Sequence, residues 1–110
     1  MSDTAKLTEE ICFAASEAGH RLFRNNSGVA KHVKGKRTWF VRYGVGPSDG
    51  GGGDLIGWTR SGRFASIEIK TGHDRQSDEQ KKWEGWVRAG GGVAGVARSV
   101  ADALAILDQK

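Results

Sequence analysis

Cysteine, proline and long apolar runs are scarce in this sequence. Its 110 residues include one cysteine, Cys12, so no disulfide can form within the chain, and we expect a cytoplasmic protein. No apolar run approaches the ~20 residues that a membrane-spanning helix needs. Residues 1–7 are polar and mixed in charge, so we expect neither a signal peptide nor a membrane partner. At this length we expect a single domain over residues 1–110.

Acidic residues are missing from a long central stretch. The formal net charge is +4, but no Asp or Glu occurs from Ala18 to Ser48. A surface with one sign of charge suits the phosphates of a nucleic acid. The alternative is a solvated basic loop with no partner. All basic residues of the stretch except Arg21 are predicted to contact DNA, namely Arg24, Lys31, Lys34, Lys36, Arg37 and Arg42.

The only proline, Pro47, lies in a glycine-rich segment. Gly44–Gly53 contains six glycines, which invites comparison with a phosphate-binding loop. A Walker loop ends in Gly-Lys-Ser/Thr and opens a helix, whereas this segment ends in Gly-Asp before an apolar strand pattern. We therefore predict no nucleotide cofactor.

Two apolar runs follow that segment with the pattern of a β-hairpin. Leu55–Trp58 and Phe64–Ile69 flank a polar stretch that contains glycine. In an antiparallel hairpin the start of one strand lies beside the end of its partner. Asp54 is therefore expected close to Glu68, and Lys70 shares a face with Glu68 because side chains alternate along a strand.

Two carboxylates at that distance repel each other unless a cation lies between them. Oxygen ligands without a nearby set of imidazoles or thiolates favour Mg²⁺ or Mn²⁺ over zinc. Lys70 could then hold an attacking water or stabilise an anionic phosphate transition state. The alternative is a surface hairpin with solvated charges, because Glu-x-Lys is a common tripeptide.

The rest of the chain alternates between helix and strand patterns. Apolar residues at helical spacing, ended by Gly19, predict a first helix over about residues 4–18. Val29–Lys36 is expected to be a basic loop or a short irregular strand. Strands are predicted at 20–24, 37–43, 55–58, 64–69 and 93–98, and later helices at 77–89 and 100–107. This order, α-β-β-β-β-α-β-α, predicts an α/β (α+β) fold with a mixed sheet flanked by helices.

The second of these helices has a clear start and an apolar side. Ser77 is expected to cap it, with Gln80 at the capping-box position three residues later. Its inner face is predicted to consist of Trp83, Trp86 and Val87.

The hairpin resembles the PD-(D/E)XK nuclease motif. Asp54 and Glu68-Ile69-Lys70 stand as Asp…Glu-x-Lys, with thirteen residues between the carboxylates. More narrowly, fragments from Arg24 to Ser99 are similar, in order and spacing, to the virus-type replication-repair nuclease family, VRR-NUC. These fragments are Phe-Arg-Asn-Asn-Ser-Gly, Val-Arg-Tyr-Gly-Val-Gly, Gly-Asp-Leu-Ile-Gly, Ile-Glu-Ile-Lys-Thr, Ser-Asp-Glu-Gln and Val-Ala-Arg-Ser. The residue before the motif Asp is usually Pro in this family and is Gly53 here, so a looser approach to Asp54 is expected.

The resemblance implies a restriction-endonuclease-like core and a metal-dependent nuclease site. Asp54, Glu68 and the carbonyl of Ile69 would bind Mg²⁺ or Mn²⁺. Lys70 would orient the attacking water or stabilise the transition state. Gln80 would support Lys70 or a phosphate, in addition to its capping role.

The resemblance also asks for an acidic residue on the first helix. We assign it to Glu10, which lies at the edge of the apolar stripe and would complete the outer metal shell. Glu9 or Glu17 remain alternatives. Simple compensation of the helix dipole would account for Glu10 equally well.

By family analogy we expect a phage or prophage DNA endonuclease that acts in replication or repair. The analogy implies a homodimer that cuts branched or flapped DNA such as junctions. A non-catalytic DNA-binding accessory module that kept the fold is the alternative from another class. A nuclease that acts on RNA is a third possibility.

Overall fold

The structure, a computed structural model, describes residues 2–46 and 52–110. Its elements are, in order, α1 (Asp3–Glu17), β1 (Arg21–Arg24), β2 (Gly28–Lys34), β3 (Arg37–Tyr43), β4 (Leu55–Trp58), β5 (Phe64–Ile69), α2 (Asp78–Ala89), β6 (Val93–Ala97) and α3 (Val100–Leu107). The predicted α/β class is confirmed, and the predicted helices and strands begin and end within a residue or so of these bounds. The order contains one strand more than predicted, β2, where a loop or irregular strand was expected.

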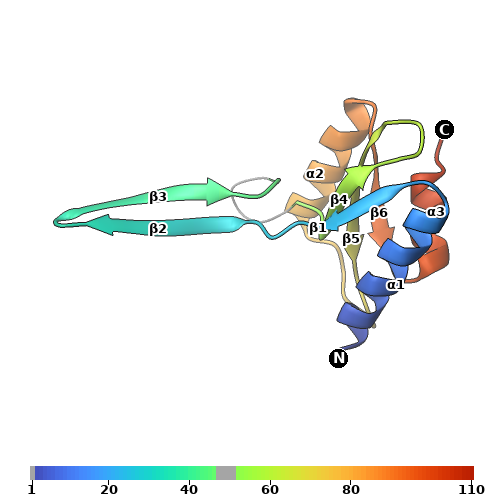
Figure 1. The fold of residues 1–110 in the computed structure, drawn as a ribbon, viewed down its shortest axis with the longest axis horizontal. Helices are drawn as coiled ribbons and strands as arrows, with labels where there is room; N and C mark the ends of the chain where they lie inside the picture. Colours follow the sequence, from blue (N-terminus) through green and yellow to red (C-terminus); the bar gives the residue numbers. More distant parts are fainter. Residues whose placement is uncertain (1, 47–51) are drawn as a thin grey trace.

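A mixed sheet forms the body of the described structure. Its strand order is β1-β4-β5-β6, with antiparallel neighbours except for the parallel pair β5–β6. The parallel pair follows from the connection through α2, because parallel neighbours need a crossover. Figure 1 shows the sheet between α2 on one side and α1 with α3 on the other.

The central strand β5 sends its side chains alternately to these two sides. Ile67 and its odd-numbered neighbours join the apolar core with residues of α1 and α3, such as Ile11 and Leu107. The even-numbered Ser66 and Glu68 are hydrogen-bonded to side chains of α2. The α2 side of the sheet therefore carries the polar residues of β5, and the α1–α3 side carries the core.

Helix α2 covers its side of the sheet with fewer aromatic residues than expected. Val87 is buried and Trp83 is partly buried, but the side of the helix that carries Trp86 faces solvent, and Trp86 is 61% exposed. The prediction that Trp86 belongs to the inner face was wrong. Val87 lies four residues after Trp83 and on the same side of the helix, whereas Trp86 lies a full ~100° around the helix from the buried Val87.

Strands β2 and β3 form a separate two-stranded ribbon, which we call the arm (Gly28–Tyr43). They pair antiparallel along their whole length, from Gly28 opposite Tyr43 to Lys34 opposite Arg37. Figure 1 shows the arm extending away from the sheet and helices, which gives the molecule a longest dimension of 51 Å. Strand β3 was predicted, but it lies outside the mixed sheet, and all seven of its residues are exposed.

The turn of the arm explains why β2 escaped prediction. Gly35, with a φ of +62°, occupies a two-residue turn that returns the chain directly onto its own preceding residues. The apolar alternation of β2 is interrupted by Lys31 and His32, so its pairing with β3 defines it more clearly than its own sequence does.

Part of the glycine-rich segment expected over Gly44–Gly53, including Pro47, lies outside the described residues. Among the helices of the described residues, none combines the length and the apolar character needed to cross a membrane.

Candidate active site

The register of the β4–β5 hairpin places the two predicted carboxylates together. Leu55 lies opposite Ile67, so Asp54 immediately precedes the ladder beside Glu68. The carboxylate of Asp54 accepts a hydrogen bond of 2.8 Å from the backbone N–H of Ile69. This bond fixes Asp54 against the strand that carries Glu68 and Lys70.

Glu68 is a buried carboxyl group with mixed surroundings. Its Oε1 accepts a 2.6 Å hydrogen bond from Gln80 and lies 3.8 Å from the ammonium nitrogen of Lys70. Its Oε2 is buried and has no hydrogen-bond partner in the described part of the chain. Burial, followed by the negative charge of the nearby Asp54, raises the pKa of Glu68 from 4.5 to about 8, while Lys70 opposes the shift.

The geometry of Glu68 fits a site for a divalent cation. A buried carboxyl oxygen without a partner, next to a second carboxylate, is stabilised either by a proton or by a cation. Mg²⁺ is commonly held by only one or two protein carboxylates, with water and substrate phosphate completing its ligands. Asp54 and Glu68 meet that requirement, and their oxygen donors also suit Mn²⁺.

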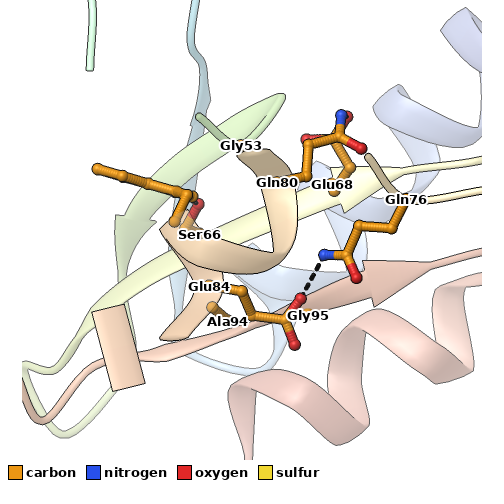
Figure 2. Close-up of a pocket in the computed structure, with 9 residues that line it drawn as sticks. Gly53, Ser66, Glu68, Gln76, Gln80, Glu84, Ala94 and Gly95 are labelled. Atoms are coloured by element: carbon orange, nitrogen blue, oxygen red, sulfur yellow. Dashed lines mark hydrogen bonds between the residues drawn. The ribbon is translucent and has the colours of Figure 1, made fainter. Parts of the chain in front are cut away.

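Gln80 serves the helix and the site at once. Its side-chain oxygen accepts from the backbone N–H of Ser77 at 2.8 Å, and Ser77 in turn accepts from the backbone N–H of Gln80 at 3.1 Å. The amide nitrogen of Gln80 remains free to donate to Glu68 at 2.6 Å. Figure 2 shows Gln80 next to Glu68 at a pocket that Gln76 and Glu84 also line.

The sequence analysis did not identify Ser66 as part of these surroundings. The indole N–H of Trp83 donates to the hydroxyl of Ser66 at 2.9 Å, which fixes α2 over the sheet. A Cβ atom on Gly53 would lie only 2.2 Å from that hydroxyl oxygen. The hydroxyl thus fills the space that a Cβ before Asp54 would need, so glycine fits this position.

Asn25 is a second residue that the sequence analysis missed. Its side-chain N–H groups donate to the carbonyls of Val45 at 2.6 Å and Gly53 at 2.9 Å, and its side-chain oxygen accepts from the N–H of Val45 at 3.0 Å. Its backbone N–H donates to the carbonyl of Asp54 at 2.8 Å. Asn25 therefore joins the base of the arm to the start of β4. In the sequence Asn25 belongs to the fragment Phe-Arg-Asn-Asn-Ser-Gly of the family resemblance, but nothing in that fragment assigned it a role.

The structure does not bring an acid of α1 to this site. Glu10 is exposed, as are Glu9 and Glu17, and α1 packs on the opposite side of the sheet from Glu68. Within residues 2–46 and 52–110, no third acidic, histidine or cysteine side chain joins Asp54 and Glu68 in a possible metal cluster.

The predicted DNA-contacting residues are exposed and mostly lie along the arm. Arg24 is at the end of β1, and the others belong to the arm, namely Lys31, Lys34, Lys36, Arg37 and Arg42. Arg24 pairs with Leu55, the residue after Asp54, whereas the residues of the arm lie outside the sheet that carries Glu68. Any shared ligand would have to be long enough to span the arm and the sheet.

Comparison with known proteins gives one match. A family model described as the VRR-NUC domain matches residues 24–101, which is more than half of the chain. The matched region includes Asp54, Glu68, Lys70 and Gln80 but not α1. No curated protein and no solved structure matches the chain significantly.

Proposed function

The chain belongs to the VRR-NUC family of nucleases, and from this premise we propose that it is a divalent-metal-dependent DNA endonuclease. The observation that carries the proposal is the buried oxygen of Glu68 beside Asp54, which has no hydrogen-bond partner among the described residues. Lys70 and Gln80, which contact the other oxygen of the same carboxyl, complete a site suited to a cation and a phosphate.

Asp54, Glu68 and the carbonyl of Ile69 would hold Mg²⁺ or Mn²⁺. The bound ion would lower the pKa of a water molecule and neutralise charge on the scissile phosphate. Gln80 keeps Glu68 in place, and Asp54 is kept in place by the N–H of Ile69.

Lys70 is proposed to act directly on the reacting atoms. Its side chain is largely buried, with 17% exposed, and its backbone N–H is bound to the carbonyl of Ala97. From there its ammonium would orient the attacking water or stabilise the pentavalent phosphate. Water forms the new bond to phosphorus, the phosphodiester bond breaks in line, and the departing oxygen takes a proton.

The proposed part of Glu10 in an outer metal shell has weaker support. Its exposure and the position of α1 across the sheet argue against direct contact with Asp54 or Glu68. Glu9 and Glu17 share the same difficulty. The assignment stays a prediction, to be tested by comparing the divalent-cation affinity of Glu10→Gln with that of the unaltered protein.

The substrate is proposed to be branched or flapped DNA, cut by a homodimer during phage or prophage replication and repair in a bacterial cytoplasm. The exposed basic side chains of the arm support DNA as the polymer, because phosphate contacts supply most of the affinity of such proteins. Contacts with phosphates position the DNA backbone on the protein but do not recognise the base sequence. Such contacts are compatible with an enzyme that selects its substrate by the shape of the DNA rather than by its sequence.

The test is cleavage of labelled single-stranded, duplex, flapped and four-way-junction DNA, and of matched RNAs, with Mg²⁺, Mn²⁺ or EDTA. Asp54→Ala is compared with Asp3→Asn, which alters an exposed acid at the start of α1. We expect metal-dependent cutting of DNA that Asp54→Ala abolishes and Asp3→Asn retains. Binding without cutting under any metal would indicate the non-catalytic module, and cutting of RNA alone would assign a different substrate. If the protein neither binds nor cuts any of these nucleic acids, the proposal is wrong.

A further inference from the structure

The arm exposes apolar side chains that its own fold does not cover. Phe40 is 65% exposed, Val33 63% and Tyr43 50%. A two-stranded ribbon on its own is at best marginally stable in water. Exposed apolar groups concentrated on such an element mark a surface that binds something.

The register of the arm pairs aromatic rings with nitrogen-bearing side chains. Phe40 lies directly opposite Lys31, and Trp39 lies opposite His32 on the other side of the ribbon. The rings of Trp39 and His32 are stacked, with centroids 5.5 Å apart and planes inclined by 14°. The guanidinium of Arg37 lies 5.7 Å from the centroid of Trp39.

The charge of the arm limits what can cover it. The sequence from 28 to 43 holds five Lys or Arg residues and no acid, so two arms packed together would bring like charges into contact. A polyanion meets the charge, but phosphates alone leave the rings uncovered. Unpaired nucleotides supply both a phosphate and a flat base, whereas paired bases hide their faces inside the duplex.

We propose that the arm binds unpaired DNA, with Phe40 and Trp39 stacking on bases while neighbouring Lys and Arg side chains hold the phosphates. This inference rests on the proposed function, because it names the feature of a branched or flapped substrate that the nuclease would recognise. It also explains why each side of the ribbon carries both aromatic and basic side chains.

The test measures DNA binding by fluorescence anisotropy in EDTA, so that cutting plays no part. The probes are a single strand of thymidines, a flapped duplex and a blunt duplex. Phe40→Ala and Trp39→Ala are each expected to weaken binding of the first two by about tenfold or more, and to leave the duplex unaffected. Lys31→Ala should weaken all three and reduce the salt dependence by about one phosphate contact.

Trp86→Ala removes an exposed tryptophan from α2 rather than the arm, and it should bind like the unaltered protein. Phe40→Tyr keeps a ring and should keep the affinity for single strands. The inference would be overturned if Phe40→Ala and Trp39→Ala lost as much affinity for the duplex as for the single strand. The inference would also be overturned if Phe40→Ala or Trp39→Ala changed the protein from dimer to monomer in sedimentation while its DNA affinity stayed the same. That result would show that a second copy of the chain covers the arm. If the aromatic variants lose single-strand affinity but the protein cuts no DNA, only the proposed nuclease activity is refuted. If the protein cuts DNA but these variants keep their single-strand affinity, only this inference is refuted.

Discussion

At the scale of single residues, Lys70 and Glu68 affect each other's chemistry. Lys70 lies 3.8 Å from Glu68 and opposes the rise in the pKa of that carboxyl. A substitution at either position therefore alters a charge that the other depends on.

We expect Lys70→Ala to lower the cleavage rate by about a hundredfold or more, because a group that stabilises the transition state is lost. Metal and DNA binding should remain largely intact at high pH. The cleavage that remains should have its optimum at higher pH, since the pKa of Glu68 rises further without the ammonium. Single-turnover rates across a pH series measure both effects.

Lys82→Ala is the matched control, because Lys82 is an exposed lysine of α2 that pairs with Glu79, outside the site. Full cutting by Lys70→Ala would show that the role given to Lys70 is wrong.

The raised pKa of Glu68 makes the stability of the metal-free protein depend on pH. In the folded protein Glu68 keeps its proton up to about pH 8, whereas in the unfolded chain it loses it near 4.5. The folded state thus binds more protons between these values, so the free energy of unfolding should fall as the pH rises from 4.5 to 8.

Glu68→Gln carries no titrating group and should remove most of that decline. In EDTA at pH 8 the variant should melt at a higher temperature than the unaltered protein. With Mg²⁺ the order should reverse, because only the carboxylate binds the ion. Thermal melts at several pH values with and without metal test this, and identical slopes for the two proteins would contradict it.

At the scale of elements, the site depends on how three segments meet. Asn25 follows β1 and is bonded to Val45 beyond the arm and to Gly53 before β4. The position of Asp54 is therefore set partly by a residue that binds no metal.

We expect Asn25→Ala to lower the free energy of unfolding by ~1–3 kcal/mol, because partly buried backbone groups lose their partners. It should also weaken Mg²⁺ binding, since the chain at Asp54 is no longer held. Thermal melts and isothermal titration with Mg²⁺ measure the two effects. Asn26→Ala alters the exposed neighbouring residue and should change neither. Unchanged Mg²⁺ affinity in Asn25→Ala would show that Asn25 only stabilises the fold.

Local patterns in the sequence predicted the elements of the sheet well. Leu55–Trp58 and Phe64–Ile69 are apolar runs bounded by polar residues and glycine, and such runs define buried strands without knowledge of the rest of the fold. The same pattern placed Asp54 next to Glu68. Roles that depend on contacts distant in the sequence were not predictable, as the bonds of Asn25 and Ser66 show.

The helices show the same limit. Apolar spacing indicates which side of a helix is buried, but not which side of the sheet the helix covers. Glu10 was assigned to the site because the family resemblance asks for an acid on the first helix and Glu10 lies at the edge of its apolar stripe. Helix α1 packs across the sheet from Glu68, and the assignment stays a prediction. Trp86 shows a second limit, because an apolar residue at helical spacing can still face solvent, as its 61% exposure shows.

At the scale of the whole molecule, the body and the arm are separable in their packing. The apolar core contains residues of the sheet and helices, and none of its members belongs to the arm (Gly28–Tyr43). The stability of the body should therefore not depend on the arm.

Replacing Gly28–Tyr43 with a short Gly-Ser linker should leave a folded protein whose melting temperature changes by only a few degrees. Asp54, Glu68 and Lys70 should still bind Mg²⁺, while affinity for DNA falls sharply because five basic side chains are lost. Circular dichroism melts, Mg²⁺ titration and anisotropy with DNA check these expectations. An unfolded product would show that the arm is needed for the body to fold.

The double use of Gln80 limits which residues can replace it in related sequences. A capping box accepts Gln or Glu equally well, since either side chain offers an oxygen to the N–H of Ser77. Only Gln also offers an N–H to Glu68, so Glu at this position would lose the bond that holds Glu68 in place. A change that preserves the helix would thus damage the cation site. Homologues that keep both carboxylates should therefore avoid Glu at position 80, although the helix alone would allow it.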